Sequence, residues 1–202
     1  MNWKTIQEKT RIFADEVLGN TSGNRRKILL QNMEKLEKQG ISCAGCSGPC
    51  CTFIANSMEI TLLEALDLLS YLESENRLTQ ETYEQWLTTI KNNRLDVPPP
   101  GSGKKNFLRR TYTCPFFAEG EKGCTISPEF KPYGCLGFNP IPEGKQGTDC
   151  TQKNTIMKER ERDFETFEER ANLQLAKELA LTLEKKSVPL ILKELVESIE
   201  NR

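Results

Sequence analysis

The apolar residues of the first 40 positions recur at helical spacing. One set falls close to a single helical face: Trp3, Ile6, Phe13 and Val17. A second set follows the polar stretch GNTSGN: Leu29, Met33 and Leu36. Apolar residues that recur every three or four positions are typical of an amphipathic helix, and a cluster of Gly, Asn and Ser typically interrupts one. The pattern therefore predicts two helices over residues 1–40.

Helical periodicity returns in the middle of the chain. The stretch ITLLEALDLLSYL begins with Thr61 and Glu64, the spacing of a capping box, in which each side chain bonds an otherwise unpaired backbone N–H. The buried stripe of this helix is expected at Leu62, Leu66 and Leu69. A further helix is predicted around 79–94, with these residues on one side: Tyr83, Trp86, Leu87 and Ile90.

The C-terminal quarter of the chain has the strongest helical pattern. A helix is predicted over about 155–186, with one apolar face made of Phe164, Phe167, Ala171, Leu175 and Leu179. Ser187 and Pro189 are expected to end this helix and begin a last one, because Pro is favoured in a first helical turn. The last helix has its apolar face at Ile191, Leu195 and Ile199.

Between these helices lie two stretches without helical periodicity. VPPPGSGKKN, over 97–106, is a linker by composition, and its resemblance to a phosphate-binding loop fails because Pro98 stands where the first glycine belongs. Residues 107–150 are rich in Gly, Pro and aromatics, which predicts turns and one or two short strands, LRRTYTC (108–114) being the best candidate. The expected fold is mainly α, with helices flanking an irregular cysteine-rich core with little or short β-structure.

Length and charge limit the class of protein. A chain of 202 residues suits one domain, with N-terminal helices at 1–40, a cysteine-bearing region at 41–150 and C-terminal helices at 155–202. The net charge of −1 gives no reason to expect nucleic acid as a partner. The charged first 20 residues do not resemble a secretory signal, and no apolar run approaches the roughly 20 residues that cross a bilayer. We therefore expect a cytoplasmic protein with no membrane partner.

The cysteines carry the candidate chemistry. There are eight, four of them within CAGCSGPCC: Cys43, Cys46, Cys50, Cys51, Cys114, Cys124, Cys135 and Cys150. The chain has no histidine, which excludes Cys₂His₂ zinc sites, Ser-His-Asp triads and Cys-His nucleophiles. A reducing cytoplasm disfavours a disulfide framework, and a thioredoxin-type dithiol lacks its βαβ context here. Ordinary buried cysteines are the remaining alternative, but eight confined to 43–150 favour metal ligation.

The cysteine spacings leave the number of metals open. Cys43-x-x-Cys46 is the spacing that lets two thiolates bind one tetrahedral ion. Adjacent side chains are expected to diverge, so Cys50 and Cys51 predict a spare thiol, two metal sites or a polynuclear cluster. Eight thiolates suit two four-coordinate sites, or one iron–sulfur cluster with further cysteines. Asp149 and Glu59 are candidate oxygen ligands or bases, although solvated surface carboxylates are the favoured interpretation of both.

Several short sequences together resemble the YkgJ-type cysteine-cluster proteins. They are CAGCSGPCC, EITLLEAL, CPFFAEGEKGCTI, KPYGCLGF and the final Cys150. The resemblance covers roughly 43–150 and gives all eight cysteines a place. It implies a zinc- or iron-chelating domain with a CxxCxxCC signature. The chain departs from the family pattern in having three residues between Cys46 and Cys50, Lys131-Pro132 in place of Arg-Pro, Leu136 in place of an arginine, and Ser127 in place of an aromatic.

The residues and the resemblance lead to one expected function and two alternatives. We expect a metal-binding protein in which cysteine thiolates hold zinc or iron, the latter as a [4Fe–4S] cluster, with no catalysis assigned. A flagellin lysine methylase is similar in sharing such a cluster, which implies the alternative of an iron–sulfur enzyme or redox protein acting on another protein. A helical interaction module with a purely structural zinc is the third hypothesis.

Overall fold

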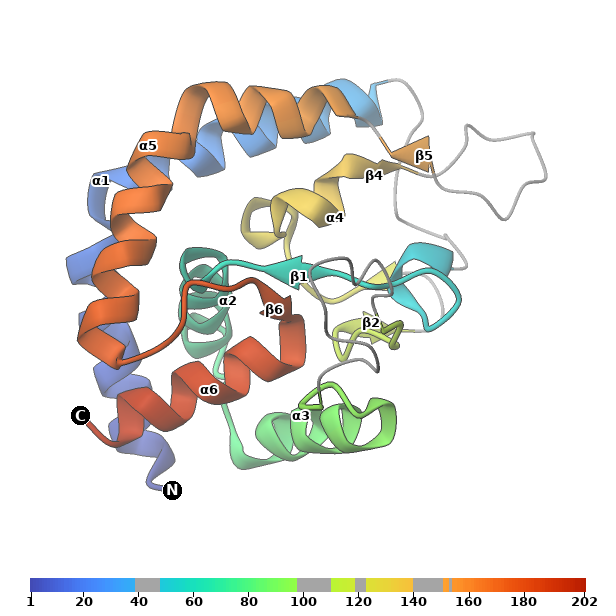
Figure 1. The fold of residues 1–202 in the computed structure, drawn as a ribbon. Helices are drawn as coiled ribbons and strands as arrows, with labels where there is room; N and C mark the ends of the chain where they lie inside the picture. Colours follow the sequence, from blue (N-terminus) through green and yellow to red (C-terminus); the bar gives the residue numbers. More distant parts are fainter. Residues whose placement is uncertain (39–47, 98–109, 119–122, 140–150, 153) are drawn as a thin grey trace.

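The computed structural model describes residues 1–38, 48–97, 110–118, 123–139, 151–152 and 154–202 of the chain. The protein is mainly helical, as the sequence predicts, and each strand in the described ranges is two residues long. The helices gather on one side of the molecule and the cysteine-bearing turns on the other, while the two chain ends lie close together (Figure 1). The terminal ammonium of Met1 lies 3.5 Å from the carboxylate of Glu200.

The N-terminal region is one helix, α1 (Trp3–Glu37), and the prediction of two helices is wrong. The polar stretch GNTSGN lies within it. Gly and Asn lower helix propensity by up to about 1 kcal/mol each but leave the backbone hydrogen bonds possible, whereas only Pro removes one. Packing against other helices therefore determines that α1 is continuous. Helix α1 contacts α2 (Leu62–Ser74), α5 (Asn154–Leu179) and α6 (Val188–Glu200). Figure 1 shows α1 and α5 running side by side.

Helix α2 is the centre of the fold. Its capping box is present as predicted, with Thr61 accepting from the Glu64 backbone N–H and Glu64 accepting from that of Thr61. Leu62, Leu66 and Leu69 are buried, but so are most other residues of the helix. The helix packs against α1, α5 and α6, so almost every one of its faces is covered. A helix that is apolar on most faces is expected in such a central position.

Helix α3 (Gln80–Asn93) confirms the prediction for 79–94 and begins at the N-cap residue Thr79. Tyr83, Trp86 and Ile90 are buried, whereas Leu87, expected on the same side, is 36% exposed. The hydroxyl of Tyr83 donates to Glu197 of α6 over 2.8 Å, so the buried face of α3 is the one that meets α6.

Helix α5 ends at Leu179, earlier than the predicted 186. Ala180 adopts the left-handed conformation (φ 52°), and the N–H of Leu181 bonds to the carbonyl of Ala176 over 2.9 Å, which is the Schellman way of ending a helix. Leu175 and Leu179 are buried as expected, but Phe167 is 63% exposed. The neighbouring Glu168 is buried instead, so the buried stripe passes one position later than the apolar pattern suggested.

Helix α6 begins where the sequence places it. Ser187 is its N-cap, Pro189 lies in its first turn, and the expected face is buried: Ile191, Leu195 and Ile199. The strand β6 (Lys186–Ser187) directly precedes α6 and pairs antiparallel with β1 (Glu59–Ile60), which directly precedes the cap of α2. This short pairing ties the starts of the two most apolar helices together.

In the described residues, the cysteine-bearing side of the molecule consists of seven short elements. In chain order they are η1 (Pro49–Cys51), β2 (Phe117–Ala118), β3 (Gly123–Cys124), η2 (Pro128–Phe130), α4 (Tyr133–Gly137), β4 (Phe138–Asn139) and β5 (Thr151–Gln152). Strand β2 pairs antiparallel with β3, placing Phe117 opposite Cys124, and β4 pairs antiparallel with β5. The predicted linker at 97–106 lies, apart from Val97, outside the described residues.

The strand predicted over 108–114 is absent from its described part, 110–114. Instead, the N–H groups of Tyr112 and Cys114 donate to the carbonyls of Asn56 and Cys51, over 2.9 and 2.7 Å. The partner segment is a 3-10 turn followed by a further turn, so it offers isolated acceptors rather than a ladder. No helix within the described ranges is long and apolar enough to cross a membrane.

Candidate metal centre

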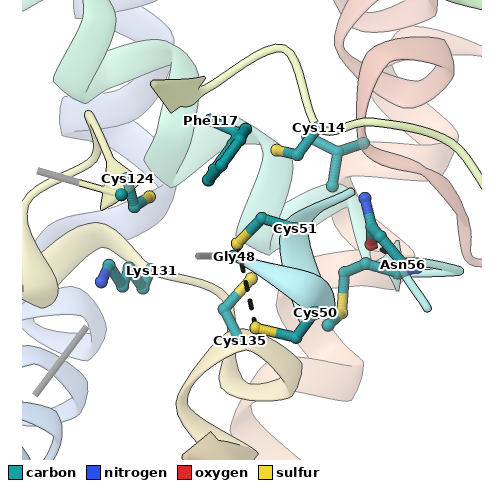
Figure 2. Close-up of a pocket in the computed structure, with 12 residues that line it drawn as sticks. Gly48, Cys50, Cys51, Asn56, Cys114, Phe117, Cys124, Lys131 and Cys135 are labelled. Atoms are coloured by element: carbon teal, nitrogen blue, oxygen red, sulfur yellow. Dashed lines mark hydrogen bonds between the residues drawn. The ribbon is translucent and has the colours of Figure 1, made fainter. Parts of the chain in front are cut away.

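Five of the eight predicted ligands line one cavity of about 60 Å³ at the meeting point of the short elements. They come from four separate segments of the chain: Cys50 and Cys51 from η1, Cys114 from the turn before β2, Cys124 from β3 and Cys135 from α4. Figure 2 shows their side chains arranged around this cavity. Cys43, Cys46, Cys150 and the candidate ligand Asp149 lie outside the described residues.

The two adjacent cysteines face the same cavity. The Sγ atoms of Cys50 and Cys51 lie 3.9 Å apart, so the expectation that neighbouring side chains diverge is wrong here. The reason is local: η1 is a 3-10 turn closed by a 2.8 Å bond from the Cys51 N–H to the Gly48 carbonyl. This tight turn brings both thiols to one side, which neither a strand nor a regular α-helix does.

Gly48 makes the tight turn of η1 possible. Its φ of 69° lies in the left-handed region, where any other residue is strained. A Cβ at this position would also overlap the ring of Phe117, which lines the same cavity. Glycine is therefore required twice over, once by the backbone and once by the close approach of the Phe117 ring.

Tyr112 fixes the segment that carries Cys114. Its backbone accepts a 3.0 Å hydrogen bond from the side-chain amide of Asn56. Its buried hydroxyl donates to the carbonyl of Met58 over 2.7 Å and accepts from the N–H of Val188, at the start of α6, over 3.0 Å. Cys114 is thereby held against the turn after η1 and against the helical core.

Arg77 fixes the hairpin that carries Cys124. The guanidinium, from the turn after α2, donates to both the carbonyl and the hydroxyl of Thr125, each over 2.8 Å. Tyr71 of α2 adds a longer bond of 3.4 Å to the same carbonyl and stacks on Phe130 at 4.7 Å between ring centroids. Because two coplanar N–H donors of the same guanidinium bond Thr125, they fix the position of Thr125 more closely than a lysine ammonium could.

Glu64 fixes the short helix that carries Cys135. Its buried carboxylate accepts a 3.0 Å hydrogen bond from the backbone N–H of Tyr133, in the first turn of α4. A Cβ on Gly134 would overlap the sulfur of Met58, so this helix approaches the strand β1 region closely. The capping residue of α2 therefore also orients a candidate ligand on α4.

Burial keeps two of the thiols protonated while no cation binds them. Burial raises the pKa of Cys114 to about 12, and the neighbouring Cys124 and Cys50 act in the same direction. Burial likewise raises the pKa of Cys135 well above its usual value, assisted by Cys114 and Cys124 and opposed by Lys131. When a metal binds such clustered thiols, they lose their protons to the solvent, because only the thiolate is a ligand.

The remaining wall of the cavity adds sulfur and one positive charge. Met58 contributes a thioether, and Lys131 lines the cavity with a side chain that is 7% exposed. The amide of Asn56 is already engaged, since it donates to Tyr112 and accepts from the N–H of Met58. Among the described lining residues there is no carboxylate, and the half-buried Glu59 lies on β1 outside the lining. Sulfur is thus the donor that the wall supplies.

Lys131 and Met58 line the cavity but are not among the candidate ligands found by sequence. Lys131 precedes Cys135 by four positions, a spacing that gave the one available signal of proximity. Met58 has no comparable signal, because it reaches the cavity through the tertiary approach of α4. In Figure 2 the Lys131 ammonium lies at the far end of its side chain from the Cys50, Cys51 and Cys135 sulfurs, so its methylenes face them.

The described thiols line one cavity but are not yet arranged as the full ligand set of a metal ion. Within the described ranges no group of three or more Cys, Asp or Glu side chains is arranged to hold an ion. None of the five described cysteines forms a disulfide. Comparisons of the chain with protein-family models, curated proteins and solved structures each give no match. The resemblance to the cysteine-cluster family therefore stays a prediction.

Proposed function

We propose that the protein binds a metal, as zinc or as an iron–sulfur cluster, through cysteine thiolates in this cavity. The observation that carries the proposal is the convergence of cysteines from four separate segments on one cavity whose described wall offers no competing carboxylate. Soft thiolate ligands suit zinc and iron–sulfur centres. Cys43, Cys46 and Cys150 complete the proposed set of eight.

The bound metal would act as a structural link between the short elements. In the described residues, two strand pairs of two residues each, β2–β3 and β4–β5, and single hydrogen bonds hold these turns in place. Metal binding free energy becomes folding free energy when ligands come from segments that do not otherwise assemble. The centre would therefore stabilise the cysteine-bearing side against the helical side, without a catalytic role.

The proposal places the protein in the cytoplasm, where thiols stay reduced and available for metal. Nucleic acid is not among the proposed partners, because the chain carries 28 basic and 29 acidic residues. The metal ion or cluster is the partner that the cavity supports. A redox or enzymatic role on another protein is the second hypothesis, and it requires the metal to be an iron–sulfur cluster.

The test is metal analysis of full-length protein purified without oxygen. We expect about one or two equivalents of zinc per chain, or about four of iron for each [4Fe–4S] cluster, with absorption spectra recorded before and after dithionite. Folded protein that is isolated in this way without metal, has eight titratable thiols and does not bind added zinc or iron would refute the proposal. A visible band that dithionite bleaches, together with acid-labile sulfide, would favour the iron–sulfur hypothesis.

Ligand variants give an independent test of the same proposal. Each Cys→Ser change at Cys50, Cys51, Cys114, Cys124 or Cys135 should lower metal content and melting temperature together, because ligation and folding are coupled. Thr52→Ser is the matched control, since it alters a neighbouring side chain in the same turn and removes no sulfur. If most cysteine variants keep both properties, these cysteines serve only to pack the core.

A further inference from the structure

We infer that Cys50 and Cys51 chelate one and the same metal ion, as in a zinc-type site and not as in a [4Fe–4S] cluster. The inference rests on the proposed function and names the kind of metal that the cavity takes. It reverses what adjacency alone suggests, because consecutive residues normally direct their side chains apart.

The first observation is the separation of the two sulfurs. A zinc–thiolate bond is about 2.3 Å long, so an Sγ–Sγ separation of 3.9 Å corresponds to an S–Zn–S angle of about 115°. This angle lies close to that of a tetrahedron. The two thiols can therefore bind one ion with little change in the 3-10 turn, by exchanging two S–H protons for the ion.

The second observation is the turn that fixes this separation. Gly48 is held in the left-handed conformation, and its carbonyl accepts from the N–H groups of both Cys51 and Thr52, over 2.8 and 3.1 Å. Phe117 closes the space beside Gly48 and lines the cavity. The pair is thus preorganised, so chelation requires little ordering of the backbone.

The same separation argues against a cubane cluster. In a [4Fe–4S] cluster each thiolate binds a different iron, so two sulfurs that share one metal do not belong to its ligand set.

Cys135 is the candidate for a third ligand of this ion. Cys135 belongs to α4, which Glu64 orients through the Tyr133 N–H, and its thiol lines the same cavity. The described thiols do not yet meet ligand geometry as a group of three, so binding draws one of them toward the Cys50–Cys51 pair. Lys131 lies near Cys135, where its charge offsets part of the negative charge that several thiolates confer on a zinc site.

The experiment is differential alkylation of the wild-type full-length protein at partial metal loading. Metal-free protein is reconstituted with half an equivalent of Zn²⁺ under reducing, oxygen-free conditions, briefly alkylated, and analysed by tandem mass spectrometry of the peptide containing both cysteines. Joint chelation predicts molecules labelled at both Cys50 and Cys51 or at neither. A second measurement, Co²⁺ titration followed by visible absorption, reports the thiolates on one ion and its stoichiometry.

The variants sharpen the result. Cys50→Ser and Cys51→Ser should each weaken Zn²⁺ binding by more than about tenfold, since even loss of an outer-shell partner costs about 10–100-fold. Each should also reduce the thiolate-to-Co²⁺ charge-transfer absorption to a similar extent, whereas Thr52→Ser leaves both properties unchanged. The alkylation experiment uses unaltered protein, so a variant that fails to fold does not affect it.

The outcomes distinguish this inference from the proposed function. Zinc-loaded molecules labelled singly at Cys50 or Cys51 in large amounts would overturn joint chelation while leaving metal binding intact. Native protein that contains iron and sulfide in a 4:4 ratio would overturn joint chelation and the zinc-type site while leaving metal binding intact. Protein that binds none of Zn²⁺, Co²⁺ or an iron–sulfur cluster would overturn the inference and the proposed function together.

Discussion

The carboxylate of Glu64 accepts a 3.0 Å hydrogen bond from the backbone N–H of Tyr133, 69 positions later in the chain. The same carboxylate accepts a 2.9 Å bond from the N–H of Thr61 in the capping box of α2. One buried side chain thus accepts a hydrogen bond from a backbone N–H at the start of each of two helices. Because α4 carries Cys135, a helix-capping interaction in the core positions a candidate metal ligand.

We expect Glu64→Gln to destabilise the protein and to weaken metal binding. Gln keeps the size but replaces one acceptor oxygen with an amide donor, so one of the two bonded N–H groups loses its partner. An unsatisfied buried donor costs about 1–3 kcal/mol. Urea unfolding and Zn²⁺ affinity would be measured together, with Glu75→Gln, at the exposed C-cap residue of the same helix, as control. Unchanged zinc affinity in a destabilised variant would show that α4 does not depend on Glu64.

The sequence contains enough information for most of the helical fold. The capping residues Thr61 and Glu64, and the Ser187–Pro189 start of α6, are local signals, and the structure confirms both. The prediction of two helices in place of α1 is wrong, because GNTSGN is a weak helix former whose packing against α2, α5 and α6 cannot be seen in one sequence. Local patterns predict local structure well, and long-range packing overrides them where the two compete.

The candidate site could be predicted only in part. Cysteine spacing identified all five cysteines that line the cavity, since residue type is itself the signal. The orientation of Cys50 and Cys51 is not predictable from the sequence, because it depends on a 3-10 turn. That turn requires Gly48 in a left-handed conformation in close contact with Phe117, a residue from a distant segment. Lys131 and Met58 reach the cavity through tertiary contacts, so no sequence spacing assigns them to it unambiguously.

We expect Gly48→Ala to be far more damaging than Gly134→Ala. At Gly48 the new methyl group meets the rigid ring of Phe117, and the left-handed backbone itself costs about 1–2 kcal/mol for a residue with a Cβ. At Gly134 the overlap is with the end of the flexible Met58 side chain, and Ala gains up to about 1 kcal/mol of helix propensity over Gly.

Thermal unfolding of the two variants would measure the difference. Gly48→Ala should lose at least about 2 kcal/mol, the sum of backbone strain and steric overlap, and should bind zinc weakly. Gly134→Ala should stay within about 1 kcal/mol of the parent. Equal stability of the two variants would mean that the turn at Gly48 adapts without strain.

We expect Arg77→Lys to loosen the hairpin of Cys124. The guanidinium bonds Thr125 through two separate nitrogens, and an ammonium cannot reproduce this planar pair. The loss should be about 1–2 kcal/mol, the usual range for a hydrogen bond to a charged group. Hydrogen exchange at the Thr125 N–H, which donates to Phe116 over 2.9 Å, would report local opening. The exposed Arg11→Lys should change nothing, and equal exchange in both variants would contradict the role of Arg77.

The metal-free protein should lose stability as the pH rises above about 9. Burial raises the pKa of Cys114 from its usual 9.0 to about 12, and the pKa of Cys135 shifts in the same direction. Between these values the folded chain keeps protons that the unfolded chain releases, so higher pH favours unfolding. The stabilising contribution is complete below pH 9 and disappears as the pH passes 12. Each thiol lowers the free energy of unfolding by up to about 1.4 kcal/mol per pH unit.

Urea unfolding of metal-free protein at pH 7, 8, 9, 10 and 11 would measure this slope. Cys114→Ala should reduce it, because one of the two buried thiols is gone. Metal-loaded protein should behave oppositely at lower pH: its thiolates have already lost their protons, so loading releases protons and zinc affinity rises with pH. Proton release on zinc binding is measurable by calorimetry in buffers of different ionisation enthalpy. A metal-free protein whose stability stays constant from pH 8 to 11 would show that these thiols are not buried as the cavity places them. Zinc binding without proton release would show that thiols are not the ligands of the zinc.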